Sequence, residues 1–252
     1  MADDSVIQQA AAMLRASRRT VVLTGSGISR ESGVPTFRDA LDGLWARFDP
    51  QELATPTAFR ANPKLVWDWY EYRRDVARRA RPNPGHTALA DLQRRLPALQ
   101  IITQNVDDLH EQAGSTGVIR LHGSLHDSRC FYNCQGDPTP VDVSALDFDP
   151  ANGPPRCPHC GRWVRPAVVW FGEMLPPAQL HAATDAAAHA DLMLVVGTSG
   201  LVAPAADLPH LARRGGACLI EINPVASALT PAVDLWLQGP AGEVLPRLVA
   251  AL

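Results

Sequence analysis

The chain has 252 residues, a formal net charge of −3 and 46% hydrophobic residues. This length can bury the core of one large domain, or of one domain with an inserted lobe. Charged residues make up only 19% of the chain, so no broad basic surface and no nucleic-acid partner are expected. The apolar run at residues 6–16 is too short to cross a membrane and lacks a basic flank. We therefore expect no membrane association and a cytoplasmic location.

Short apolar segments alternate with helical segments along the chain. Strands are predicted at 21–24, 100–103, 118–121, 192–196, 217–222 and 234–237, and helices at 5–18, 63–81, 86–96, 177–190 and 203–214. The strand segments show little polar alternation, which is typical of parallel strands that are buried on both faces. The sequence therefore predicts an α/β fold with a Rossmann-like, doubly wound parallel sheet.

Two segments break this alternation and predict a smaller inserted lobe. Residues 39–82 are helical and rich in aromatic residues, and residues 125–166 are rich in Cys, Pro, Asp and Gly. We interpret the first as a helical module and the second as a zinc module, with an exposed loop at 135–156. Residues 1–38, 83–124 and 167–252 then form the Rossmann-like lobe of a single catalytic unit that spans 1–252.

Four of the five cysteines form two short pairs, Cys130-x-x-x-Cys134 and Cys157-x-x-Cys160. Two such pairs can close a tetrahedral thiolate site, and four protein ligands leave no coordination place for a substrate. The pattern predicts one structural Zn²⁺, the alternative being four reduced cysteines in a loop. Cys218, in a predicted strand, is expected to be a small buried hydrophobe.

A nucleotide site is suggested where the first predicted strand ends. Gly25 and Gly27 flank Ser26 there, so the backbone can turn sharply and bring its N–H groups close to a pyrophosphate, with Ser29 as a hydroxyl donor. An ordinary glycine turn is the alternative. Other predicted strands also end in polar or glycine-containing segments, at the sheet edge where open α/β folds bind ligands: Gln104, Asn105 and Asp107; His122; Gly197, Thr198 and Ser199; Asn223. Asn and Asp at such ends can instead satisfy backbone groups.

Taken in order, these motifs resemble the sirtuin family of NAD-dependent protein deacylases, from about residue 20 to about residue 248. The family's Gly-Ala-Gly-Ile-Ser motif has Ser26 in place of alanine here. The resemblance implies that NAD is consumed as a co-substrate. It implies NAD contacts by Gly25, Ser26, Gly27, Ile28, Ser29, Pro35, Phe37, Arg38, Gln104, Asn105, Asp107, Gly197, Thr198, Ser199, Asn223 and Ala241. Within this set, Asn105 and Asp107 would hold the nicotinamide end, and Ala241 would lie against the adenine.

His122 precedes Gly123 and matches the His-Gly pair of the family. The resemblance implies that His122 is the general base that deprotonates a ribose hydroxyl. An imidazole ordinarily titrates near pH ~6.5, so it can accept a proton at neutral pH. His86, His110 and His126 lack this context and are expected to serve packing or to face solvent.

Residues 168–173 are predicted to form a core strand that ends at an exposed edge. In sirtuins this segment pairs with the extended substrate peptide, which implies substrate contacts by Val169, Phe171 and Gly172. Tyr70 and Arg73, three residues apart on a predicted helix, resemble the Tyr-x-x-Arg of the class III, desuccinylase- and demalonylase-type members, and Ala54 would leave room beside them. The alternative is a packing helix with solvated arginines.

We therefore expect a monomeric enzyme that removes succinyl, malonyl or glutaryl groups, and also acetyl groups, from lysines in proteins. The products would be nicotinamide, free lysine and O-acyl-ADP-ribose. A plain deacetylase and a protein mono-ADP-ribosyltransferase remain alternatives on the same fold. A Rossmann dehydrogenase is disfavoured because Arg30 occupies the place of the third glycine in Gly-x-Gly-x-x-Gly.

Overall fold

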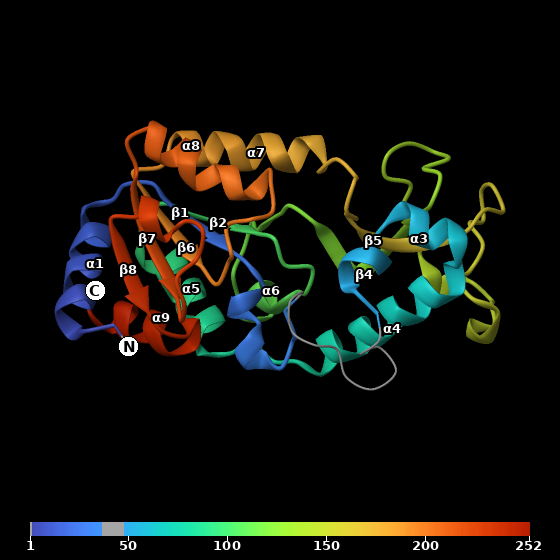
Figure 1. Ribbon diagram of the computed structural model, residues 1–252, viewed down its shortest axis with the longest axis horizontal. Helices are drawn as coiled ribbons and strands as arrows, with labels where there is room; N and C mark the ends of the chain where they lie inside the picture. Colours follow the sequence, from blue (N-terminus) through green and yellow to red (C-terminus); the bar gives the residue numbers. More distant parts are fainter. Residues whose placement is uncertain (1, 37–47) are drawn as a thin grey trace. The chain divides into compact units, whose positions relative to one another are not determined.

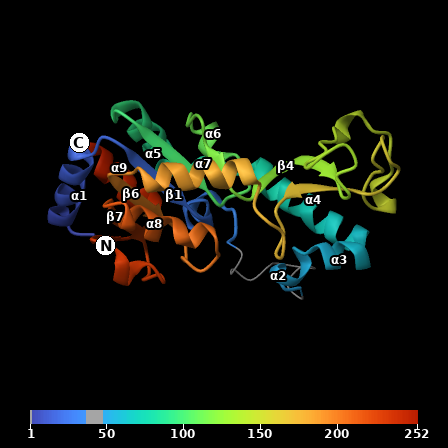
Figure 2. The ribbon, with the colours of Figure 1, turned by 90° about the horizontal axis from the view of Figure 1, so that it is seen from above.

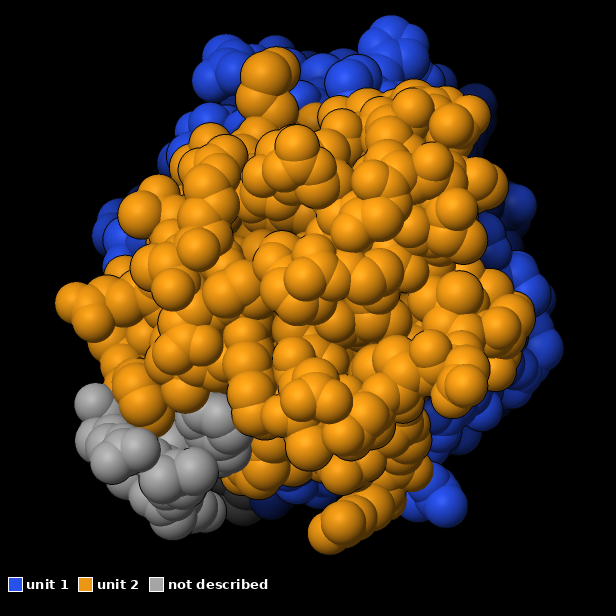
Figure 3. Space-filling view, turned by 90° about the vertical axis from the view of Figure 1, so that its right-hand side faces the viewer, with its two compact units in different colours: residues 1–36, 80–121, 176–252 blue, residues 37–79, 122–175 orange. Residues whose placement is uncertain are grey.

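The computed structural model describes residues 2–36 and 48–252, and these form two compact units (Figure 3). The larger unit comprises Met1–Thr36, Ala80–Leu121 and Pro176–Leu252, and the smaller comprises Phe37–Arg79 and His122–Leu175. Residues 122–124 and 167–175 thus belong to the smaller unit, whereas the sequence analysis placed them in the Rossmann-like lobe.

The larger unit is built on a six-stranded parallel sheet in the order β3-β2-β1-β6-β7-β8. This order is that of doubly wound dinucleotide-binding folds, so the predicted fold class is confirmed. All five residues of both β1 and β6 are buried, as a strand covered on both faces requires. The strands are β1 Thr20–Thr24, β2 Leu99–Thr103, β3 Ile119–Arg120, β6 Leu192–Val196, β7 Cys218–Asn223 and β8 Leu235–Gln238.

Helices cover both faces of this sheet (Figure 1). On one side lie α1 Asp4–Ala16, α5 Pro84–Arg95 and α9 Ala241–Ala250, which share a buried apolar cluster with the sheet. On the other side lie α7 Pro177–Ala188 and α8 Leu208–Arg214, and the short α6 Leu109–Gln112 follows β2. The helix predicted at 203–214 begins only at Leu208, after a 3-10 turn at Ala205–Asp207.

One expectation for the larger unit is wrong, and one helix was missed. Cys218 is exposed rather than buried, because it is the first residue of β7 and precedes the covered part of the strand. Helix α9 was not predicted. Its sequence carries Gly242 and an internal Pro246, both of which disfavour helix in isolation, and packing against α5 overrides them.

The smaller unit combines an antiparallel strand pair with helices. Strand β4 Gly123–Cys130 pairs with β5 Val164–Val168, and Figure 2 shows α4 Pro63–Arg79 alongside this pair, with α3 Pro56–Ala61 and the short α2 Pro50–Leu53 preceding it in the chain. Arg74 joins α4 to β4, since its buried guanidinium donates to the carbonyl oxygens of Leu125 and Asp127.

The strand predicted at 168–173 is wrong, because the strand ends at Val168. The chain then turns. Gly172 has a φ of +84°, and the N–H of Glu173 donates to the carbonyl of Trp170 at 3.0 Å. Pro166 within β5 concealed the true strand, because proline cannot donate to a sheet.

Among the described residues, no helix is both long and apolar enough to cross a membrane.

Candidate functional site

The glycine turn after β1 lies directly against the loop after β6. The N–H of Gly27 donates to the carbonyl of Gly197 at 2.8 Å. A Cβ atom added at Gly27 would lie 2.6 Å from that oxygen, and one added at Gly197 would lie 2.5 Å from the nitrogen of Ile28. The φ of Gly197 is also +60°. These glycines are therefore required by the close approach of the two backbone segments.

Three polar side chains from the segments that follow β1 and β2 form a buried cluster beside this turn. The Oγ of Ser29 donates to Oδ2 of Asp107 at 3.0 Å and accepts from Nδ2 of Asn105 at 3.0 Å. Burial raises the pKa of Asp107, although hydrogen bonds from the N–H of Leu109 and from Ser29 oppose this. The sequence placed these residues at adjoining strand ends, and the fold brings their side chains into contact.

A buried histidine lies beneath the cluster. The Nε2 of His110 lies 3.0 Å from Oγ1 of Thr24, which in turn donates to Thr103 at 2.8 Å. The ring of His110 is 5.1 Å from the ring of His86. Burial lowers the pKa of His110 to about 3 and that of His86 to about 4, so both stay neutral at pH 7. Both histidines serve packing, as expected.

At the next strand ends, a hydrogen-bonded chain links three predicted NAD residues. The Nε2 of Gln104 donates to Oγ1 of Thr198 at 2.9 Å, and Nδ2 of Asn223 donates to the Thr198 carbonyl at 2.9 Å. Ser199 follows Thr198, and its carbonyl accepts from the N–H of Ala228 at 3.2 Å. Ala241 is the buried first residue of α9, beside Gly85. Pro35 is exposed, and Phe37 and Arg38 lie outside the described residues.

One atom in the larger unit fits the amide end of NAD. The Oδ1 of Asn105 is buried and has no hydrogen-bond partner among the described residues. A buried acceptor of this kind is costly unless a ligand satisfies it, and the carboxamide NH₂ of a nicotinamide is such a donor. The residues present therefore fit the group that the resemblance implies.

His122 opens the strand pair of the smaller unit, directly before β4. Its carbonyl accepts from the N–H of Val169 at 2.9 Å, and Gly123 pairs with Val168. Gly123 has a φ of +77°, and a Cβ there would lie 2.0 Å from the Ala167 carbonyl. The His-Gly pair is thus fixed by backbone constraints on the glycine, and His122 itself is half-buried.

Of the predicted acyl-pocket residues, Tyr70 and Arg73 lie on α4, and Ala54 directly follows the short α2. Tyr70 is fully buried, and its oxygen accepts a hydrogen bond from Nε1 of Trp170 at 2.9 Å. Burial raises the pKa of Tyr70, which keeps the phenol protonated. The guanidinium of Arg73 lies 5.4 Å from the Tyr70 ring and 5.0 Å from the Trp69 ring. Tyr70 and Arg73 therefore share a helix face, as predicted.

The turn after β5 is held by a buried ion pair that sequence reasoning missed. Arg165 is 1% exposed, donates to both carboxylate oxygens of Glu173 and stacks 3.3 Å from the Trp170 ring centre. Glu173 also accepts from the N–H of Trp170 at 2.8 Å. Phe171, which follows Trp170, is 40% exposed and donates its N–H to the carbonyl of the buried Ala54. Val169 and Gly172 belong to the same turn, which the Arg165–Glu173 pair holds through the N–H of Trp170.

The four paired cysteines come together in the smaller unit. Their sulfur atoms all lie within 4.8 Å of one another. The Sγ atoms of Cys130 and Cys160 are 3.6 Å apart, and those of Cys134 and Cys157 are 3.8 Å apart. Four sulfurs bound tetrahedrally at about 2.3 Å from zinc would be about 3.8 Å apart. The extra residue in the first pair is accommodated, since Asn133 adopts a φ of +50°, and the cluster fits one Zn²⁺.

Comparisons with known proteins decide the family. The Sir2 family model matches residues 25–204. The chain belongs to the Sir2 family. The NAD-dependent protein deacylase 1 of Pseudomonas aeruginosa is 52% identical over 244 residues, which cover 94% of this chain and 95% of that protein. This membership confirms the sirtuin resemblance and the enzymatic class of the chain.

Solved structures of Sir2 proteins match the whole chain. The crystal structure of a Sir2 homologue in complex with NAD has a TM-score of 0.87 and 46% identity, covering 98% of this chain and 93% of that one. The structure of Sir2Af2 bound to a myristoylated histone peptide has a TM-score of 0.78 and 36% identity, covering 99% and 97%.

Sequence reasoning also missed Asn83, which supports the glycine turn. Its Nδ2 donates to the carbonyl of Ile28 at 2.7 Å and to Oγ of Ser32 at 3.0 Å, while its Oδ1 caps α5 through the N–H of Gly85. The signal was the Asn-Pro-Gly-His sequence at 83–86, a capping pattern in which His86 completes the box. Glu31 supports the same turn from its other side, because its carboxylate accepts from the N–H of Gly242 in the first turn of α9.

Proposed function

We propose that this chain removes acyl groups from lysine side chains of proteins and consumes NAD as it does so. The observation that carries the proposal is the polar cluster of Ser29, Asn105 and Asp107 beside the glycine turn, with the unsatisfied Oδ1 of Asn105. NAD supplies a ribose carbon whose bond to nicotinamide is broken, and the ADP-ribose carries the acyl group away. The NAD-dependent protein deacylases among the relatives support this activity.

The residues of the larger unit then bind and orient NAD. The N–H groups of Gly25 and Gly27 donate to the carbonyls of Val196 and Gly197, so the turn at 25–27 would meet the pyrophosphate through the N–H and hydroxyl of Ser26. Asn105 would accept from the carboxamide, and Asp107, held by Ser29 and the N–H of Leu109, would fix the adjoining ribose. His122 would take a proton from a ribose hydroxyl, a role that rests on the family resemblance.

The acylated lysine would be presented on an extended peptide. The N–H groups of Val169 and Phe171 already donate to His122 and Ala54. The peptide would therefore pair with the other backbone groups of Val169, Phe171 and Gly172 in the turn after β5, where Phe171 is exposed. Backbone pairing of this kind reads the shape of a strand more than its side chains. A Sir2 protein solved with a myristoylated histone peptide supports a peptide substrate.

We further infer that the preferred acyl group carries a carboxylate, as succinyl, malonyl and glutaryl do. The oxygen of Tyr70 already accepts from Trp170, so its own proton is left to be donated to a ligand. The raised pKa of Tyr70 keeps that proton in place. Arg73 adds a positive charge beside the same ring, and a guanidinium with a neutral phenol can bind a carboxylate together.

A long apolar acyl group is the second candidate. The relative solved with a myristoylated peptide is 36% identical to this chain. The pocket would then use the aromatic residues Trp69 and Trp170 rather than the charge of Arg73.

Replacing Arg73 with methionine separates the candidates. Removing one partner of a buried charged pair costs about 2–5 kcal/mol, or roughly 30-fold to several thousand-fold. We expect Arg73→Met to lower kcat/KM on a succinyl-lysine peptide by that factor and to leave an acetyl-lysine peptide within about threefold. Arg79→Met, an exposed arginine of the same helix, is the control and should leave both substrates unchanged. Equal losses on both substrates, or a myristoyl peptide as the best substrate of the unaltered enzyme, would contradict the acidic preference.

A further inference from the structure

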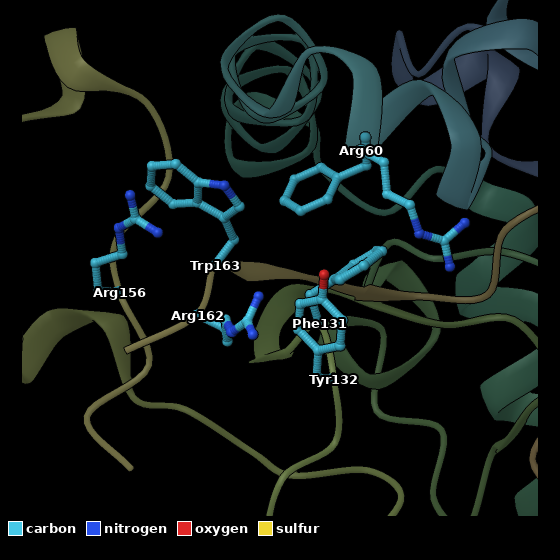
Figure 4. A pocket seen from close by; sticks show the side chains of 7 residues that line it. Arg60, Phe131, Tyr132, Arg156, Arg162 and Trp163 are labelled. Carbon is cyan, nitrogen blue, oxygen red and sulfur yellow. The ribbon is translucent and has the colours of Figure 1, made fainter. Parts of the chain in front are cut away.

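A hollow in the smaller unit, on the zinc module, carries three arginines and no acid. Phe59, Phe131, Tyr132 and Trp163 line it together with Arg60, Arg156 and Arg162, and it encloses about 300 Å³. Figure 4 shows that Arg60 comes from a helix, whereas Arg156 and Arg162 come from loop segments of the zinc module. None of these residues belongs to the predicted NAD, acyl or metal sites.

The three arginines at this hollow lack the counter-ions that other arginines of the smaller unit have. Arg129 and Arg165 form ion pairs with Asp137 and Glu173. Arg60, Arg156 and Arg162 are exposed and have no carboxylate within ion-pair distance among the described residues. A neighbouring hollow shares Arg156 and is also lined by Asp147 and Asp149. The positively charged surface therefore does not extend beyond Arg156 on that side.

Each guanidinium lies over an aromatic ring. Arg156 lies 3.2 Å from the ring centre of Trp163, Arg162 lies 5.1 Å from that of Tyr132, and Arg60 lies 5.3 Å from that of Phe131. A guanidinium over a ring face can still direct N–H groups to carboxylate or phosphate oxygens, and one N–H of Arg156 already donates to the carbonyl of Gly161 at 3.5 Å. The ordering cost of these three side chains is therefore partly met before a ligand binds.

The arrangement favours several separated anions over one compact anion. The guanidiniums lie over three different rings and do not converge on one point (Figure 4). A single phosphate would need convergent donors. A nucleotide base would need open ring faces, yet Arg156 covers a face of Trp163 and Phe59 is 1% exposed. The net charge of −3 also opposes a long polyanion.

We propose that this hollow docks an acidic polypeptide segment, with two or three carboxylates on the arginines and one apolar side chain between the rings. Its use as a docking site for protein substrates, away from the acylated lysine, rests on the proposed deacylase function. Binding of the segment does not depend on that function.

The test measures binding of a fluorescent peptide that has alternating Glu and Leu and contains no lysine. We expect the unaltered protein to bind it, with affinity that falls as salt rises, because exposed charges are screened within about 10 Å at 0.1 M salt. Arg60→Gln/Arg162→Gln should weaken binding about tenfold, through two lost ion pairs. The control Arg79→Gln/Arg214→Gln removes the same charge at exposed positions elsewhere and should bind as the unaltered protein does.

Three results would overturn the proposal: no binding of the acidic peptide, equal weakening in the control, or displacement of the peptide by AMP or inorganic phosphate at lower concentrations than by unlabelled peptide. The last result would make the hollow a phosphate site.

A second readout separates this proposal from the proposed function. A succinyl-lysine peptide that carries the acidic segment in the same chain should have a lower KM and an unchanged kcat, compared with the peptide without it. Arg60→Gln/Arg162→Gln should remove this difference in KM. If no acylated peptide is turned over while the acidic peptide still binds, the deacylase function fails and the docking site stands. If the acidic segment leaves KM unchanged, the site plays no part in substrate docking.

Discussion

At the scale of single residues, burial decides the protonation of the candidate site. His86, His110, Tyr70 and Asp107 are all buried, and burial favours the neutral form of each. His110 and Tyr70 retain one hydrogen bond that suits a neutral ring, to Thr24 and from Trp170 respectively. Their placement couples the stability and the chemistry of the chain to pH.

The two buried histidines predict a loss of stability in mild acid. Their pKa values are about 3 and about 4 in the folded chain, against about 6.5 when unfolded. As pH falls below about 6.5, both histidines become protonated in the unfolded chain but stay neutral in the folded chain. The free energy of unfolding therefore drops by up to about 1.4 kcal/mol per pH unit for each histidine. Urea unfolding between pH 7 and pH 4.5 measures this slope.

The variant His110→Gln can keep a hydrogen bond to Thr24 but does not titrate. Its slope should be smaller than that of the unaltered chain by about one histidine's share. His189→Gln, at an exposed position, is the control. Identical slopes for His110→Gln and the unaltered chain would show that His110 is not buried in its neutral form.

His122 makes the sharpest prediction for a single catalytic group. His122→Ala should lower kcat about 10²–10⁴-fold, the usual effect of losing a general base. NAD binding, measured by calorimetry, should persist, because the glycine turn and Asn105 are unchanged. His126→Ala, at an exposed position on β4, should be nearly as active as the unaltered enzyme. Turnover by His122→Ala close to that of His126→Ala would remove the assigned role.

At the scale of elements, the sequence predicted the sheet of the larger unit better than the smaller unit. Strand β6 matches its predicted range and β1 differs by one residue, because uninterrupted apolar runs between turns have few other solutions. The pair β4 and β5 was missed, since β5 contains Pro166 and β4 carries polar residues on both faces. Their pairing depends on contacts across more than thirty residues of chain, which no local pattern contains.

The candidate site follows the same division. The strand-end residues Ser29, Asn105 and Asp107 could be placed together from sequence, because neighbouring parallel strands end at one edge. The residues that support the site could not be recognised from the sequence. Asn83 and the Arg165–Glu173 pair act through tertiary contacts that the sequence shows only as an ordinary cap and two ordinary charges.

The cysteine cluster predicts that zinc holds the smaller unit. Cys157 is buried within it, so Cys157→Ser should lose the metal and lower the thermal unfolding temperature, whereas Cys218→Ser, exposed on β7, should keep both. Metal analysis, circular dichroism and activity are measured on the same samples. Four thiolates leave no place for substrate, so loss of activity with unchanged circular dichroism and thermal stability after zinc removal would refute a purely structural role. Fresh protein without zinc would refute the site itself.

At the scale of the whole molecule, the proposed chemistry is the transfer of an acyl group from lysine to ADP-ribose. It differs from hydride transfer, from simple NAD sensing and from transfer of ADP-ribose to protein by the products alone.

Mass spectrometry of the products after incubation with NAD and a succinyl-lysine peptide tests this claim most directly. We expect equal amounts of nicotinamide, unmodified lysine peptide and O-succinyl-ADP-ribose, with no product when NAD is omitted. Free succinate formed without consumption of NAD, reduced cofactor, or ADP-ribose attached to the peptide would each contradict it.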